Sequence, residues 1–295
     1  MKDPLVSVVI PNYNYAKYIA ATVDSVLSQT YRKIEVIVVD DESKDNSLEV
    51  LGAFGDRIQV IAQKNGGVSR ARNNGAAASL GDFLAFLDAD DIWLPTKIER
   101  QMERMREDES VGLVHCSMTY IDPDDNVLGE ITEGTEGNVG DKMLRFDGGG
   151  VIGAGSTSLI RKEVFDEVGG FDVRMSTAAD WDISYRIAAK HTVAVVLEPL
   201  VLYRQHNTNM HGNIGAMEHD MTLGMKKAFA AGAPSNGGVG YGNLYKTLAG
   251  SYFHAGQYPA FMRTAALGLY HKPSNLSYFL GFPFRRFRRN ATNND

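Results

Sequence analysis

Two acidic clusters in this chain have the residue types and spacing to bind a metal ion and a phosphorylated ligand. The first is Asp-Asp at 40–41, directly after the apolar run 36–39, and the second is Asp-Ala-Asp-Asp at 88–91, after the apolar run 83–87. Each run is typical of a buried strand, and open α/β sheets bind ligands at the carboxyl ends of their strands. Buried carboxylates are costly unless a cation binds them, so a divalent metal carrying a phosphorylated ligand is the expected partner.

The second cluster gives the sharper prediction. Asp88 and Asp90 alternate along an extended backbone, so both carboxylates can reach one ion held between the protein and a diphosphate. Hard oxygen ligands favour Mg²⁺ or Mn²⁺. The alternative is a solvated turn before Pro95, and the apolar strand that precedes the cluster weakens it.

The first cluster leaves two interpretations open. Asp41 at a strand end could accept the N3–H of uracil or thymine, a donor that adenine and cytosine do not present in the same place, and would then select a pyrimidine nucleotide. Acidic residues also favour helix starts, and capping of the next helix is the better interpretation of this cluster taken alone.

A third candidate site is 65–73, where Gly66 and Gly67 precede Arg70 and Arg72 at a predicted helix start. Backbone amides and a guanidinium there could bind phosphate, although a tight turn with surface arginines would look the same.

The elements that must position these clusters alternate regularly along the chain. Strands are expected at 6–10, 36–39, 58–62 and 83–87, with helices between them and a further helix that carries Ile98, Met102 and Met105. This rhythm predicts a parallel sheet with right-handed crossovers. From 121 to 150 the pattern dissolves, which predicts a mobile flap near the active site or a plain surface insertion.

Regular patterns resume in the second half of the chain. We expect a helix at 181–189, two strands at 192–197 and 199–204, and an antiparallel helix pair at 244–255 and 259–269.

The composition fits a folded protein with no general affinity for nucleic acid. The 295 residues are 44% hydrophobic and carry a net charge of −6, so the chain can bury a full core but lacks the basic balance that phosphate-backbone binding requires. Cys116 is the only cysteine, which excludes a disulfide within the chain and a cysteine-based zinc site. The first residues lead directly into a predicted strand, without the pattern of a signal sequence, and no apolar stretch approaches the roughly 20 residues of a spanning helix, so we expect a cytoplasmic protein.

Taken together, the motifs resemble those of glycosyltransferase family 2, whose members have the GT-A nucleotide-sugar-binding fold. The matching stretches are 8–14 (Val-Val-Ile-Pro-Asn-Tyr-Asn), 38–43, 65–73, 88–91, 169–172 (Gly-Gly-Phe-Asp) and 180–182 (Asp-Trp-Asp). They occur in order over roughly the first 210 residues, and the joint match is far more specific than any one motif.

The resemblance implies an α/β fold with a Rossmann-like, mostly parallel sheet flanked by helices. The catalytic domain would cover 1–212, with a nucleotide-binding half to about residue 120 and an acceptor half at 121–212. A helical C-terminal region would follow at 213–295, ending in a basic, aromatic tail.

The resemblance also assigns roles to residues of the donor site. Pro11, Tyr13 and Asp41 would hold the base, and Asn65 and Arg72 would flank the nucleotide. Asp88 would touch the ribose or the sugar, and Asp90 with Asp88 would bind the metal, Mn²⁺ or Mg²⁺. In Tyr203-Arg204-Gln205-His206, His206 could complete the metal shell and Arg204 could neutralise the leaving diphosphate. A lone histidine is more often a surface residue than a ligand, and His211 is a competing candidate.

The catalytic base of the family is an acidic residue at the start of the helix after the Gly-Gly-Phe-Asp turn, and here that position is Asp180. Residues two apart on a helix face different ways, so Asp180 would point into the cleft while Asp182 supports the helix start. The family usually has Glu or Gly directly before this Asp, and this chain has Ala179. The departure removes a second polar contact and keeps the base.

The implied activity is inverting transfer of a sugar, a hexosyl or N-acetylhexosaminyl group, from a UDP or dTDP sugar to a hydroxyl of a glycan or lipid-linked glycan, in cell-surface polysaccharide synthesis. Two other classes stay open: a sugar nucleotidyltransferase, which would want a Gly-rich basic loop where 11–14 stands, and a non-catalytic binding module, which would not need Asp180. The stretch 278–289 mixes aromatic residues with four arginines, which favours peripheral contact with an anionic membrane at its inner face or, equally, a frayed tail.

Overall fold

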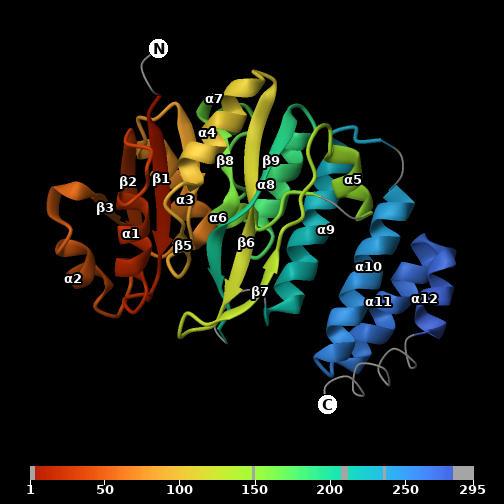
Figure 1. The fold of residues 1–295 in the computed structure, drawn as a ribbon. Helices are drawn as coiled ribbons and strands as arrows, with labels where there is room; N and C mark the ends of the chain where they lie inside the picture. The colour runs from red at the N-terminus through yellow and green to blue at the C-terminus, as the bar shows by residue number, and fades with distance from the viewer. Residues whose placement is uncertain (1–3, 148–149, 207–211, 235–236, 282–295) are drawn as a thin grey trace. The chain divides into compact units, whose positions relative to one another are not determined.

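The computed structural model describes residues 4–147, 150–206, 212–234 and 237–281 (Figure 1). The chain forms two compact units, one of Met1–Gly140 with Gly149–Asp220 and one of Asp141–Gly148 with Met221–Asp295. The boundary between the two units therefore lies after Asp220. The sequence placed it after residue 212. β6 (Val111–Ile121) runs through residue 120, and the division of the catalytic domain into a nucleotide-binding half and an acceptor half stays a prediction.

The first unit is built on one nine-stranded sheet in the order β3-β2-β1-β4-β8-β6-β9-β5, with β7 paired to β6. Its other strands are β1 (Val6–Asn12), β2 (Ile34–Asp40), β3 (Gln59–Ala62), β4 (Phe83–Phe86), β5 (Ile92–Trp93), β7 (Val127–Ile131), β8 (Leu159–Arg161) and β9 (Thr192–Arg204). Strands β1 to β4 pair in parallel, as the alternating pattern predicted. The α/β class is confirmed, but the sheet is mixed, because β8 enters between β4 and β6 and runs antiparallel to both.

Helices cover both faces of this sheet. They are α1 (Ile19–Leu27), α2 (Ser47–Gly52), α3 (Val68–Ala78), α4 (Lys97–Glu107), α6 (Ala154–Thr157), α7 (Lys162–Glu167), α8 (Ala179–Ala188) and the start of α9 (Ile214–Ala230). Alternate strand residues such as Val8 and Val38 join the core beneath α1, α2 and α4. On the other face α3 approaches β1 so closely that a Cβ at Gly75 would lie 2.3 Å from Val9 Cγ1. A side chain at this position would force α3 away from the strand.

The register of the parallel strands brings the two acidic clusters together. Asn12 at the end of β1 pairs with Asp40 at the end of β2, and β4 lies on the other side of β1 and leads into Asp88. Figure 1 shows the ends of β1 and β2 at the same lower edge of the first unit. The predicted clustering of carboxylates at one sheet edge is confirmed.

Two stretches differ from the expected elements. Within 121–150, where no pattern was visible, β7 forms a hairpin with β6 and α5 (Gly140–Arg145) follows, so the segment is divided between the two units. The two strands predicted at 192–197 and 199–204 are one strand, β9, whose pairing jumps from Cys116–Val196 to Ser117–Pro199. The intervening residues bulge out of the ladder beside Pro199, which has no N–H to donate.

The second unit is helical, as predicted. It contains the rest of α9, α10 (Gly237–His254), α11 (Tyr258–His271) and α12 (Leu276–Leu280). The predicted helix pair is confirmed as α10 and α11, and Asn275 Nδ2 donates hydrogen bonds to the carbonyls of Gly242 and Gly268, one on each helix. No helix among the described residues is long and apolar enough to cross a bilayer. Most of the predicted membrane-contacting stretch 278–289 lies outside the described residues.

Candidate active site

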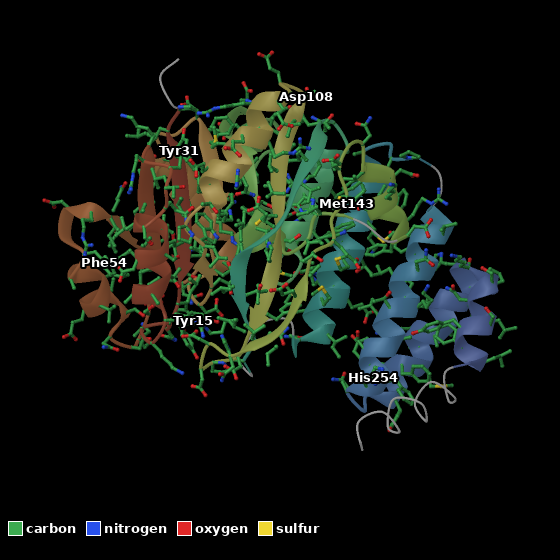
Figure 2. All side chains as sticks on the ribbon, in the orientation of Figure 1. Tyr15, Tyr31, Phe54, Asp108, Met143 and His254 are labelled. Carbon is green, nitrogen blue, oxygen red and sulfur yellow. The ribbon has the colours of Figure 1, made fainter. Side chains whose placement is uncertain are left out.

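A cleft of about 1020 Å³ opens at the carboxyl edge of β1, β2 and β4. Tyr15 lines this cleft and is labelled in Figure 2. The predicted site residues that line it are Pro11, Tyr13, Asp41, Asn65, Arg72, Asp88, Asp90 and Asp180. Arg204 and His206 are not among the lining residues, although Tyr203 and Gln205 are. The structure thus brings the predicted base pocket, acidic cluster and catalytic base into one cavity.

Beside the end of β2, Asp41 holds the turn that precedes α3. Its Oδ1 accepts hydrogen bonds from the Gly66 amide (2.8 Å) and Gln63 Nε2 (2.7 Å), and its Oδ2 accepts one from the Gly67 amide (2.8 Å). Gly67 has φ +84°, a left-handed conformation that suits glycine. An ionised carboxylate offers about four acceptor positions, so one remains on Asp41 for a ligand N–H.

Asp40 joins the ends of β1 and β2. Its Oδ2 accepts a hydrogen bond from Asn12 Nδ2 (2.7 Å) and its Oδ1 accepts one from the Ser43 amide (3.0 Å). Ser43 Oγ in turn accepts from the Asn14 amide (2.9 Å), which shapes the loop that carries Tyr13. The tyrosine is 43% exposed and stands at the mouth of the cleft.

Asp88 is paired with the arginine that sequence analysis assigned to the nucleotide. Arg72 Nη2 lies 2.6 Å from Asp88 Oδ1, and the guanidinium sits 5.2 Å from the centre of the Phe171 ring. A Cβ at Gly155 would lie 3.1 Å from Arg72 Nη2 and 3.2 Å from Asp88 Oδ2. Because Gly155 has no Cβ, it leaves room for the ion pair of Arg72 and Asp88.

Asp90 is paired with His206. The distance from Asp90 Oδ2 to His206 Nε2 is 2.8 Å, and the imidazole stacks on Tyr18 with ring centres 5.8 Å apart. Burial, and then the charge of Asp88, raise the pKa of the Asp90 carboxyl above its usual range. Burial and the nearby carboxylates, Asp90 first, raise the pKa of Tyr15 well above that of a free phenol.

The side chains at this edge fit a hard divalent cation by their chemistry. Asp88 and Asp90 supply carboxylate oxygens, the donors that Mg²⁺ and Mn²⁺ prefer, and His206 supplies an imidazole nitrogen, which Mn²⁺ accepts more readily than Mg²⁺. A cation would also relieve the repulsion that Asp88 exerts on the buried Asp90. Within the part of the chain that the structure describes, no three acidic, histidine or cysteine side chains are already arranged to hold an ion. His211, the competing candidate, lies outside the described residues.

Arg204 lies behind the cleft wall, where it is 3% exposed. Its Nε donates a hydrogen bond to the Asp90 carbonyl (2.9 Å), and its Nη1 donates to the Asp122 carbonyl (3.0 Å). Its Nη1 also forms an ion pair with Asp125. In this arrangement Arg204 fixes the backbone of the acidic cluster, which differs from the predicted contact with a diphosphate.

Sequence reasoning gave no role to Asp91, the last residue of the second cluster. Asp91 is 1% exposed, its Oδ1 accepts a hydrogen bond from the Arg204 amide (2.9 Å), and its Oδ2 accepts one from Ser156 Oγ. Burial and then the charges of Asp90 and Asp88 raise the pKa of this carboxyl. Asp91 therefore ties the cluster to β9 and α6, and its place in a run of acids was the only sequence signal for it.

Asp180 lies in the first turn of α8 and lines the cleft, as predicted. Its Oδ1 accepts a hydrogen bond from the Trp181 amide (2.8 Å). Asp182 points elsewhere: it is 1% exposed and forms an ion pair with Arg186 Nη2 at 2.7 Å. Since Arg186 also donates to the carbonyls of Val168 and Gly170, Asp182 supports the Gly-Gly-Phe turn instead of the helix start.

The wall that adjoins the ends of β6 and β9 is apolar. It contains Met118, Tyr120 and Tyr203, and the two tyrosine rings meet edge to face with centres 5.8 Å apart. Aromatic faces of this kind pack against the C–H face of a sugar ring while their hydroxyls remain available for hydrogen bonds. The tyrosines end neighbouring strands, a relation that no local sequence pattern reveals.

The half-sheet of parallel strands, its acidic turn and the carboxylate on the facing helix define a glycosyltransferase of the GT-A fold. The chain belongs to glycosyl transferase family 2, whose family model matches residues 7–169. The expected family, fold and enzyme class are confirmed, and this membership favours a transferase over the nucleotidyltransferase and the non-catalytic module.

Individual relatives agree with this assignment. The chain is 36% identical over 216 residues to an uncharacterised glycosyltransferase of Nostoc sp., an alignment that covers 70% of this chain and 66% of the relative. It is 39% identical over 145 residues to Escherichia coli WfaP, covering 48% of this chain and 56% of that protein, which is named UDP-Glc:α-D-GlcNAc-diphosphoundecaprenol β-1,3-glucosyltransferase. The chain therefore spans less than two thirds of the length of each of these two relatives.

A solved structure supports the fold independently. S. aureus TarS 1-349 in complex with UDP-GlcNAc superposes with a TM-score of 0.66 over 88% of this chain and 79% of that one, at 17% identity. At this identity the likeness concerns the fold alone.

Proposed function

We propose that this glycosyltransferase moves a hexosyl or N-acetylhexosaminyl group from a UDP or dTDP sugar to a hydroxyl of a glycan or lipid-linked glycan, with inversion at the anomeric carbon, in cell-surface polysaccharide synthesis. One observation carries the proposal: Asp41, the Asp88–Asp90 turn and Asp180 line one cleft although they come from three separate parts of the chain. The same cleft would then contain a base pocket, a diphosphate site and a proton acceptor.

At the donor end, Pro11, Tyr13 and Asn65 would surround the base. The remaining acceptor position of Asp41 suits the N3–H of uracil or thymine, which supports a pyrimidine nucleotide. Tyr13 at the mouth of the cleft would cover the base once it is bound.

Mg²⁺ or Mn²⁺ would be held by Asp88 and Asp90 with His206. When bound, the ion would supply positive charge beside the departing diphosphate. Arg204 would act by fixing the Asp90 backbone, and Arg72, which is paired with Asp88 and lines the cleft, would flank the nucleotide.

At the other end, an acceptor hydroxyl would attack the anomeric carbon in line with the leaving group, and Asp180 would take its proton. General-base assistance of this kind is typically worth about 100- to 10,000-fold in rate. The tyrosine wall of Tyr120 and Tyr203 would support the acceptor sugar.

A lipid-linked acceptor is supported by the substrate named for WfaP and by the arginines and aromatic residues of 278–289. On this proposal the enzyme acts in the cytoplasm, and the basic stretch brings it to anionic lipids at the inner face of the membrane.

The proposal is tested with a panel of nucleotide sugars in Mg²⁺ or Mn²⁺, scored by thermal stabilisation and by release of nucleoside diphosphate. We expect UDP or dTDP sugars to stabilise the wild type with metal, Asp90→Ala to abolish that effect, and Asp180→Asn to keep binding while losing release. Asp24→Asn, at an exposed position of α1, is the matched control for loss of one carboxylate. If no pyrimidine nucleotide sugar binds with either metal, the donor assignment is wrong.

A further inference from the structure

The helix that carries Asp180 begins without a capping side chain of its own. Ala178 occupies the N-cap position of α8, and the amides at a helix start need acceptors from elsewhere. The segment just before α8 also forms part of the cleft, because Ser176 and Thr177 line it beside Asp180.

The segment that leads into α8 is bound by Asp220, which comes from α9 and lies in the same compact unit as α8. Its Oδ2 accepts hydrogen bonds from the amides of Ser176 (2.7 Å), Thr177 (2.8 Å) and Ala178 (3.2 Å), and from Thr177 Oγ1 (3.1 Å). Its Oδ1 lies 3.0 Å from His219 Nδ1. One carboxylate thus binds three successive backbone amides in the segment that ends at the N-cap of α8.

Burial and charge make this contact strong. Asp220 is 2% exposed, so its charge is stabilised by these hydrogen bonds instead of by water. Burial tends to raise the pKa of Asp220, but the hydrogen bonds from His219 and from the three amides outweigh it and hold the pKa below its usual range. The positive end of the α8 dipole acts in the same direction.

The segment is held from its other end as well. Ser69 Oγ, in the first turn of α3, donates a hydrogen bond to the Met175 carbonyl at 2.6 Å. Residues 175–178 are therefore fixed by one contact from the donor side of the cleft and by the cluster of contacts from Asp220. Removing Asp220 would release the side nearest Asp180.

We infer that Asp220 is a positioning residue for the glycosyl transfer: it fixes the first turn of α8 so that the Asp180 carboxylate meets the acceptor hydroxyl. This inference rests on the proposed role of Asp180 as the base. Asp220 is not among the residues that line the cleft, so its effect passes through the backbone of 176–178. The donor pocket is built by β1, β2 and the turn before α3, which Asp220 does not contact among the described residues.

The test uses Asp220→Asn in the full chain, with the donor identified by the nucleotide-sugar panel and turnover measured as release of nucleoside diphosphate. Asparagine keeps the size but replaces one charged acceptor by an amide, and a base displaced by about 1 Å costs about 100-fold in rate. We expect kcat to fall about 100-fold while the donor KM changes less than about twofold, and Asp220→Glu to recover part of kcat because it retains the charge. The inference is overturned by an unchanged kcat, or by equal losses of kcat and donor affinity.

A second readout does not depend on activity. The hydrogen bonds that Asp220 accepts from the amides of 176–178 form a clamp on this segment. Hydrogen exchange of these amides should be faster in Asp220→Asn than in the wild type or in Asp24→Asn, and unchanged exchange would contradict the clamp. If the wild type transfers no sugar although these amides are protected, the proposed function fails and the structural clamp stands.

If Asp220→Asn does not fold, a second variant tests the inference. Thr177→Val removes one hydrogen bond of the clamp, and it should lower kcat several-fold at constant donor KM. An unchanged kcat in that variant would overturn the inference.

Discussion

The proposed donor end of the cleft, around Asp41, and the end that carries Asp180 are held by contacts of different range. Asp41 binds Gln63, Gly66 and Gly67, all within 26 positions along the chain. The segment before α8 is held by Ser69, 106 positions from Met175, and by Asp220, 43 positions from Thr177. The turn that Asp41 holds is thus a nearly local structure, whereas the segment before α8 requires distant parts of the chain to be in place. We therefore expect changes at the two ends to separate into effects on binding and effects on turnover.

The largest expected effect is at the catalytic end. Asp180→Asn removes the proton acceptor and should lower kcat about 1000-fold, with donor Kd unchanged, because the donor pocket is built by other elements. Single-turnover rates and calorimetric donor titrations measure the two quantities separately. A parallel loss of donor affinity would erase the distinction between the two ends.

The next effect tests how the turn behind α8 is held. Asp182→Ala breaks a buried ion pair and leaves Arg186 without its carboxylate, which should lower the free energy of unfolding by about 3 kcal/mol. The control is Asp166→Ala, which breaks the exposed pair of Asp166 with Lys162 at the same i, i+4 spacing and should cost less than about 1 kcal/mol. Urea denaturation measures both, and similar losses in the two variants would argue against a supporting role for Asp182.

At the donor end, Asp41→Asn should weaken nucleoside diphosphate binding about 30-fold, or about 2 kcal/mol. The introduced NH₂ group would face an amide donor of Gly66 or Gly67, so the turn would lose an acceptor that it needs. Turnover at saturating donor should be nearly unchanged. Asp24→Asn, at an exposed position of α1, serves as control. An Asp41→Asn variant that lost kcat but kept affinity would contradict the proposed roles of the two ends.

The smallest effect is a pH dependence from Asp220. Its pKa is lowered in the folded protein, so the stability it contributes is fully present above its unfolded pKa of about 3.9 and is lost as the pH falls through the folded value. Comparing urea unfolding of the wild type and Asp220→Asn from pH 7 to pH 3, we expect the difference between them to shrink only below about pH 4. A difference that is constant with pH would mean that the Asp220 charge adds nothing to the clamp.

The same contrast explains what sequence could predict. Asp41, Asp88 and Asp90 follow apolar runs, and because parallel strands end at one sheet edge, a local pattern was enough to bring them together. Asp180 came from the family resemblance and not from a pattern of its own. The role of Asp182 was misjudged because its partner, Arg186, reaches a turn that precedes the helix.

The features that sequence missed depend on long-range pairing. β8 inserts antiparallel between β4 and β6, an order that the strand–helix rhythm does not encode. Arg204 was assigned to a diphosphate, but it is buried against Asp90, 114 positions away. Tyr120 and Tyr203 become one wall only through the pairing of β6 with β9.

The contact between Asp220 and the start of α8 also bears on how shorter fragments of this protein should be cut. A fragment that stops at the end of β9 retains every motif that the family resemblance supplied, yet it loses the carboxylate that binds the amides of 176–178. Such a fragment would be expected to bind nucleotide and transfer poorly. A minimal catalytic fragment should therefore extend at least through the first turns of α9, where Asp220 lies.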